Sequence, residues 1–255
     1  MTLLKVNNMS KMFGGLKAVS NFTMEIAAGE LIGLIGPNGA GKTTAFNLLT
    51  GVYEPTTGEI EFDGQNVIGL KPYEINQRGI ARTFQNIRLF SELSVIDNVK
   101  IAYHSHVKYN LVESILRIGR YHGEEAEIEE KAERFLEIFK LADKKDEISK
   151  NLPYGEQRRL EIARALAAQP KLLLLDEPAA GMNPQETHKL MDMIRWIKDE
   201  FKLTILLIEH DMSLVMGVCE RIYVLDYGTI IAQGTPQEIK NNPRVIEAYL
   251  GEEVH

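Results

Sequence analysis

The alternation of apolar and polar residues predicts strands near both ends of the chain. Residues 3–8 and 19–26 have the period of strands, and "FGG" between them favours a turn. "EPTTGEIEFDGQNV" and "RIYVLDYGTIIAQG" predict hairpins, because turn residues lie beside short alternating runs. "KLLLLDEP" and "TILLIEHD" are continuous apolar runs, which are typical of parallel strands covered on both faces.

Helical spacing dominates from about residue 94 to residue 150. Ser94 can cap a helix beginning at "VIDNVKIAYH", and "EEAEIEEKAERFLEIFK" has an apolar face opposite an acidic one. A helical block between two strand-rich parts is typical of an α/β core with an inserted subdomain. We predict one domain in which residues 1–85 and 167–255 form the α/β core with a β subdomain, and residues 86–166 form a helical subdomain.

Composition narrows the class of protein. The chain has 255 residues and a net charge of −7, which argues against a broad nucleic-acid surface. The one cysteine, Cys219, excludes a disulfide framework. No apolar run approaches the roughly 18–20 residues of a membrane helix, and the first residues lack the pattern of a secretion signal. We therefore expect that the chain does not cross a membrane by itself and binds no nucleic acid.

The segment "GPNGAGKTT" fits the phosphate-loop pattern G-x-x-x-x-G-K-[ST] between an apolar strand and a helix. Glycines let successive N–H groups face one concavity, and the helix N-terminus adds partial positive charge. Lys42 would contact the outer phosphates, and the Thr43 hydroxyl would bind Mg²⁺. The predicted nucleotide-binding residues of this loop are Gly36, Pro37, Asn38, Gly39, Ala40, Gly41, Lys42, Thr43 and Thr44.

Polar residues at three further strand ends complete a predicted ATPase site. Asp176 ends "LLLLDEP" and would hold the Mg²⁺ shell, and Glu177 follows it as a candidate base for the attacking water. His210 ends another strand, where it could donate to the γ-phosphate. Gln85 lies where a strand gives way to the helical block, and it could reach Mg²⁺ or the attacking water.

Together these motifs, in this order, resemble the ATP-binding subunits of ABC transporters over essentially the whole chain. The resemblance implies an α/β fold: a P-loop NTPase (ABC ATPase) core, an antiparallel β subdomain and an inserted helical subdomain. It implies ATP and Mg²⁺ as cofactors, ATP hydrolysis as the activity, and adenine stacking by Phe13. It also implies a head-to-tail homo- or heterodimer with a second ABC ATPase.

The segment "LPYGEQRRLEIARAL" is similar to the family signature "LSGGQRQRVAIARAL". The resemblance implies that Tyr154, Gly155 and Glu156 cap the γ-phosphate of ATP held by the opposite subunit. Pro153 replaces the signature serine, and it suits the first turn of a helix, where a missing donor costs little. Glu156 puts an anion near phosphate, which should repel it unless Arg158, Arg159 or solvent compensates.

The loop "AAGMNP" also departs from the family pattern "TSALDP", since Asn183 replaces aspartate. Asn183, Pro184 and Glu186 nevertheless predict a helix start with a capping box.

"GGLKAVSNF", "RTFQNIRLF", "DEPAAGMNP" and the ending "VIEAYLG" are similar to the ATPases of branched-chain amino acid importers, as is an insertion at about 104–125. This similarity implies two permease subunits, indirectly a solute-binding protein, and a peripheral place on the cytoplasmic face of the membrane. Alternatives are the ATPase of a urea or amide importer or of a lipid exporter, a soluble ABC protein, and a P-loop small-molecule kinase.

Overall fold

A computed structural model of the chain describes residues 1–104, 107 and 111–250. The chain divides into two compact units, Met1–Arg82 with Lys171–His255, and Thr83–Pro170. The helical segment predicted at 86–166 falls within the second unit. Parts of the predicted insertion (105–106 and 108–110) and of the C-terminal motif (251) lie outside the described residues.

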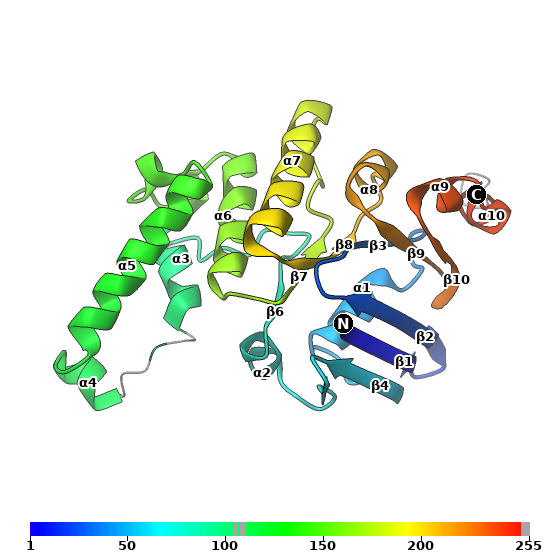
Figure 1. The fold of residues 1–255 in the computed structure, drawn as a ribbon, viewed down its shortest axis with the longest axis horizontal. Coiled ribbons are helices and arrows are strands. Elements are labelled where there is room, and N and C mark those ends of the chain that lie inside the picture. Colours follow the sequence, from blue (N-terminus) through cyan, green and yellow to red (C-terminus); the bar gives the residue numbers. More distant parts are fainter. Residues whose placement is uncertain (105–106, 108–110, 251–255) are drawn as a thin grey trace. The chain divides into compact units, whose positions relative to one another are not determined.

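The first unit contains a four-stranded antiparallel sheet with the order β2-β1-β4-β5 (Figure 1). Its strands are β1 (Thr2–Phe13), β2 (Leu16–Ala27), β4 (Thr57–Phe62) and β5 (Gln65–Asn66). The predicted turn at "FGG" and the hairpin at "EPTTGEIEFDGQNV" are confirmed, although β1 and β2 are longer than predicted. Alternate residues of β2 are buried, as its sequence period requires.

A second, six-stranded sheet has the order β10-β9-β3-β8-β7-β6. Its strands are β3 (Leu31–Ile35), β6 (Ile80–Arg82), β7 (Leu172–Asp176), β8 (Thr204–Ile208), β9 (Arg221–Asp226) and β10 (Thr229–Gly234). All neighbours are parallel except the β9–β10 hairpin. The apolar runs predicted as covered parallel strands are confirmed, because every residue of β3, β7 and β8 is buried.

Helices cover the six-stranded sheet of the first unit. They are α1 (Lys42–Leu49), α2 (Pro72–Gln77), α7 (Pro184–Phe201), α8 (Met212–Val218), α9 (Pro236–Lys240) and α10 (Pro243–Leu250). In Figure 1, α7 and α8 lie on one side of this sheet, and α1 lies on the other side, toward the four-stranded sheet. Buried residues of α1 such as Phe46 join Phe22 and Leu34 in one apolar core that holds both sheets.

The capping box predicted at the start of α7 is confirmed. The Asn183 side chain accepts hydrogen bonds from the N–H groups of Gln185 and Glu186, each at 3.0 Å. In return, the Glu186 carboxylate accepts from the Asn183 N–H at 2.9 Å. Asparagine therefore replaces aspartate without loss of the cap.

The second unit is helical. It contains α3 (Val95–Tyr103), α4 (Leu111–Leu116), α5 (Tyr121–Ile138) and α6 (Tyr154–Ala167), with short 3₁₀ turns before α6. Ser94 caps α3 as predicted, since its hydroxyl accepts from the Asp97 N–H at 3.1 Å. Helix α3 packs against α5 and α6, and the Tyr103 ring of α3 lies edge-on to the Phe135 ring of α5 with centroids 5.9 Å apart. None of the helices described in either unit is long and apolar enough to cross a membrane.

Candidate functional site

The parallel strands of the first unit bring the predicted phosphate loop and the polar strand ends to one edge of a sheet. Ile208 of β8 is in register with Leu34 of β3 on one side and with Asp176 of β7 on the other. Gly36 and His210, just beyond β3 and β8, and Asp176, the last residue of β7, therefore lie at the carboxyl ends of neighbouring strands. Open α/β sheets bind ligands at this edge.

The phosphate loop needs its glycines for geometric reasons. A Cβ built on Gly36 would lie 1.9 Å from the Leu225 carbonyl oxygen, so no side chain fits at this position. Gly41 forms the N-cap of α1 with a left-handed φ of 102°, and a Cβ there would lie 2.5 Å from the Ala18 oxygen. The loop thus turns tightly between β3 and α1, and its backbone leads directly into the N-terminus of α1.

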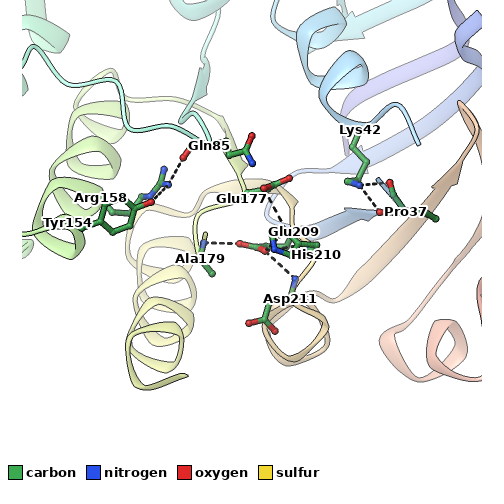
Figure 2. Close-up of polar contacts among 11 residues, drawn as sticks. Pro37, Lys42, Gln85, Tyr154, Arg158, Glu177, Ala179, Glu209, His210 and Asp211 are labelled. Atoms are coloured by element: carbon green, nitrogen blue, oxygen red, sulfur yellow. Dashed lines mark hydrogen bonds and ion pairs between the residues drawn. The ribbon is translucent and has the colours of Figure 1, made fainter. Parts of the chain in front are cut away.

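Lys42 lies inside this loop. Its ammonium donates to the carbonyl oxygens of Gly36 at 2.6 Å and Pro37 at 2.8 Å, and the residue is 8% exposed (Figure 2). These two carbonyls orient the ammonium inside the loop. The loop therefore holds a cationic group close to the amides at the start of α1, which is a suitable environment for phosphate.

Asp176 is paired with an arginine that the sequence did not single out. Its carboxylate accepts from the Arg82 guanidinium at 2.6 Å, and the two side chains are 5% and 8% exposed. Arg82 also donates to the Asn47 side chain at 2.7 Å and lies over the Phe46 ring at 5.5 Å. The pair follows from the parallel pairing of β6 with β7. The strand predicted to end near Gln85 is β6, which ends at Arg82, so Gln85 lies three residues beyond it.

Glu177 has an uncommon backbone conformation. Its φ is 45°, in the left-handed region, and its N–H donates to the Ile208 carbonyl at 2.9 Å. Such a conformation costs a non-glycine residue roughly 1–3 kcal/mol. The turn separates the two acids: Asp176 pairs with Arg82, while the Glu177 carboxylate lies 3.6 Å from His210 Nδ1.

His210 follows a buried carboxylate, Glu209, that also escaped the sequence prediction. The Glu209 carboxylate accepts from the N–H groups of Ala179, His210 and Asp211 at 2.7, 3.1 and 3.3 Å (Figure 2). Burial raises the pKa of this carboxyl above its ordinary value, although these N–H groups act in the opposite direction. Glu209 thereby ties the loop after Glu177 to the loop that bears His210, whose side chain is 59% exposed.

Phe13, predicted to stack on adenine, lies at the end of β1 and is 41% exposed. Its ring packs edge-on against Tyr53 with centroids 5.2 Å apart. The Lys11 ammonium lies 5.3 Å from the centre of the Phe13 ring. An exposed aromatic pair with a neighbouring cation provides an apolar face on which a base can stack. Tyr53 was not predicted, because it lies in a turn far from Phe13 in sequence.

Gln85 and the signature segment belong to the second unit. Gln85 is exposed, and its main-chain carbonyl oxygen accepts a hydrogen bond from the Arg158 guanidinium at 2.8 Å. Tyr154 is the first residue of α6, is 46% exposed and accepts from Arg158 at 3.2 Å through its hydroxyl. The structure thus brings Gln85 and Tyr154 to one guanidinium, a connection that sequence spacing did not indicate.

The structure corrects two details of the predicted signature. Pro153 is the N-cap of α6 rather than part of its first turn, and its carbonyl accepts from the Glu156 N–H at 2.9 Å. The cations that compensate Glu156 are Lys144 at 2.6 Å and Arg159 at 3.6 Å. Arg158 does not contribute, because it points into the unit's interior. The hydrogen bond with Glu156 raises the pKa of Lys144 above its ordinary value.

Gly155 has no internal reason to be glycine. It lies in the first turn of α6, its φ is not left-handed, and a Cβ built on it meets no atom within 4 Å. Glycine in a helix is less favourable than alanine by up to about 1 kcal/mol. The residue therefore suits an approach by a molecule outside this chain, as the predicted γ-phosphate contact requires.

The donor set fits a magnesium nucleotide better than a metal bound by protein alone. Among the described residues, no group of three or more His, Cys, Asp and Glu side chains could hold a metal ion. Magnesium commonly binds one or two protein oxygens together with substrate phosphates and water. In the first unit, the Asp176 carboxylate and the hydroxyl of the exposed residue Thr43 are oxygen donors of that kind, and the second unit offers the amide of Gln85.

Comparison with known proteins agrees with these observations. Residues 19–180 match the family model described as ABC transporter, and residues 229–255 match the model described as branched-chain amino acid ATP-binding cassette transporter. Over 250 residues the chain is 49% identical to the high-affinity branched-chain amino acid transport ATP-binding protein LivG of Escherichia coli K12, with 98% of each chain covered.

Two solved structures have the same fold. One is the ADP conformation of MJ1267, an ATP-binding cassette of an ABC transporter, with a TM-score of 0.85 and 31% identity over 98% of this chain and 99% of that one. The other is a dimeric post-hydrolysis state of the cassette MJ0796 bound to ADP and Pi, with a TM-score of 0.77 and 25% identity over 92% and 99%. These similarities confirm the fold class predicted from the motifs.

Proposed function

We propose that this chain, which belongs to the ABC transporter family of ATP-binding proteins, is the ATP-hydrolysing subunit of a branched-chain amino acid importer. The observation that carries the proposal is the gathering of the phosphate loop, Asp176, Glu177 and His210 at one sheet edge. The near full-length similarity to LivG supports the choice of solute. The lipid-exporter alternative has weaker support, because the identity to the lipopolysaccharide export ATP-binding protein LptB of Haemophilus influenzae is 35% over 253 residues.

The residues at the sheet edge have separate roles in this proposal. Lys42 and the loop amides bind the phosphates of ATP, and Phe13 contacts the adenine. Thr43, Asp176 and Gln85 hold Mg²⁺, which offsets phosphate charge when it is bound. Glu177 orients and deprotonates the attacking water, and His210, 3.6 Å from Glu177, donates to the γ-phosphate.

The signature segment acts on a second subunit. Two ATPase subunits, of one kind or of two, pair so that Tyr154, Gly155 and Glu156 of one face the phosphate loop of the other. The dimeric MJ0796 structure and the open space beside Gly155 support this arrangement. ATP-driven closure then moves two permease subunits, which receive solute from a binding protein. The chain accordingly works on the cytoplasmic face of the membrane.

The first test is Glu177→Gln in the transporter assembled with its permeases. The amide keeps the size of the side chain but cannot take a proton, so we expect ATP turnover to fall by about 10²–10⁴-fold with nucleotide binding retained. Glu200→Gln, on the exposed end of α7, is the matched control and should behave as wild type. Full turnover by Glu177→Gln would contradict the role assigned to Glu177.

The solute is tested separately, in vesicles that contain the assembled transporter. We expect ATP-dependent uptake of leucine, isoleucine or valine when the binding protein is present. Uptake of urea or short amides in place of these amino acids would overturn the solute assignment and leave the ATPase assignment intact. Transfer of the γ-phosphate to an acceptor other than water would instead indicate a kinase.

A further inference from the structure

Helix α6 carries a fully buried ion pair. Arg158 Nη1 lies 2.8 Å from Glu161 Oε2, and the two side chains are 0% and 1% exposed. Such a pair is weak evidence for stability, because desolvation of the two charges opposes their attraction. Moreover, Arg158 Nε is buried without a hydrogen-bond partner among the described residues, which costs further stability. A role other than stabilisation of the fold is therefore needed to explain the Arg158–Glu161 pair.

The pair holds the backbone around Gln85. Arg158 donates to the carbonyl oxygens of Phe84 at 2.7 Å and Gln85 at 2.8 Å. Glu161 Oε1 accepts from the N–H groups of Arg88 at 3.1 Å and Phe84 at 3.4 Å. Each charged group thus bonds both its partner and main-chain atoms of the segment 84–88, so displacement of that segment would leave buried charges poorly compensated.

The same guanidinium reaches the start of the signature. Arg158 Nη2 donates to the Tyr154 hydroxyl at 3.2 Å as well as to the Gln85 carbonyl (Figure 2). Tyr154 replaces a glycine of the general family signature, and this hydrogen bond gives the replacement a partner. One buried side chain therefore contacts both segments that we assign to ATP turnover in this unit.

The downstream end of the segment is also anchored. The buried side chain of Asn98 on α3 accepts from the Phe90 N–H at 2.9 Å and donates to the Phe90 carbonyl at 3.1 Å. The Ser149 hydroxyl donates to that carbonyl at 2.9 Å. The backbone from 84 to 90 is thus fixed at both ends, while the side chains of Gln85 and Asn86 remain exposed.

We propose that Arg158 and Glu161 are positioning residues that lock the Gln85 segment to the signature helix, so that both move as one piece. The general signature, "LSGGQRQRVAIARAL", has glutamine and alanine at these two positions, so this ion pair is an addition rather than a requirement of the fold. The inference rests on the proposed function in one respect only, namely that Gln85 and the signature take part in ATP turnover.

The test is the double variant Arg158→Gln/Glu161→Ala, which removes both charges and leaves none buried alone. The matched control is Arg134→Gln/Glu130→Ala, which removes an exposed pair from α5. In the isolated chain, hydrogen exchange at the Phe84 and Arg88 amides should rise about tenfold or more over the control, because both lose their acceptor. In the assembled transporter, kcat for ATP should fall about tenfold with KM within about twofold.

Arg158→Lys provides a second measurement that does not depend on folding of the double variant. Lysine keeps the charge opposite Glu161 but lacks the planar fork that reaches two carbonyls, so kcat should lie between wild type and the double variant. Unchanged exchange would overturn the lock, and faster exchange with unchanged kcat would overturn its role in turnover. If wild type itself hydrolyses no ATP, the proposed function fails, whereas the exchange result still decides the lock.

Discussion

Removal of the arginine beside Asp176 is the most direct test of the electrostatics at the sheet edge. Arg82→Met keeps an apolar stem over the Phe46 ring, so the variant deletes the charge that lies 2.6 Å from the Asp176 carboxylate and, with it, the hydrogen bond to the Asn47 side chain. That carboxylate is 5% exposed and would remain buried without its cation. We therefore expect a loss of stability rather than a neutral change.

The magnitude follows from the burial of both side chains. Removing one partner of a buried ion pair typically costs about 3–5 kcal/mol, because the remaining charge is uncompensated. In a chain of this size each kcal/mol lowers the unfolding midpoint by about 2–4 °C, so the expected decrease is roughly 6–20 °C. The double variant Arg82→Met/Asp176→Asn removes both charges. Its loss of stability should be smaller than the sum of the losses in Arg82→Met and Asp176→Asn.

The assay is thermal unfolding of the isolated chain, first without nucleotide and in EDTA. Arg78→Met is the matched control. Arg78 is an exposed residue at the C-cap of α2, so this variant should change stability by no more than about 0.5 kcal/mol. If Asp176 binds Mg²⁺ as proposed, Mg²⁺ with nucleotide should raise the midpoint of Arg82→Met more than that of wild type. A midpoint for Arg82→Met equal to that of Arg78→Met would refute the reasoning.

Two further predictions concern Gly155 and Glu209. Gly155→Ala should leave unfolding unchanged or raise stability by up to about 1 kcal/mol, yet lower transporter ATP turnover about tenfold. Gly123→Ala in α5, where a Cβ also meets nothing within 4 Å, should change stability alone; equal turnover in both variants would contradict the assignment. For Glu209, the raised folded pKa means that its contribution to stability is present below the unfolded pKa and is lost as pH rises through the folded value. The urea midpoint of wild type should therefore fall relative to that of Glu209→Gln as pH rises above the ordinary carboxyl pKa. A wild-type midpoint that rises relative to that of Glu209→Gln as pH rises would show that the N–H groups outweigh burial.

The sequence was sufficient where a signal was local. Continuous apolar runs predicted the covered strands β7 and β8, and the Asn183 capping box was predicted from three residues. The phosphate loop was found for the same reason, since its spacing fixes its geometry. The roles of its residues stay predictions until they are measured.

Contacts between side chains far apart in the chain could not be predicted from the sequence. Arg82 meets Asp176 only because β6 and β7 pair across about ninety residues of chain. Arg158 and Arg159 are adjacent, and only the rotational setting of α6 decides that Arg158 faces the interior while Arg159 reaches Glu156. Glu209 had one available signal, an acid directly after an apolar strand, but its three N–H partners come from two separate loops.

The left-handed backbone of Glu177 has a consequence for protein engineering. Glycine or asparagine would relieve the conformation at φ 45°, so a library screened only for heat resistance should accumulate these residues at position 177. If Glu177 is the base that we propose, such variants would be more stable and would lose ATP turnover. Stabilisation of this protein for practical use should therefore hold that position fixed and seek improvement elsewhere.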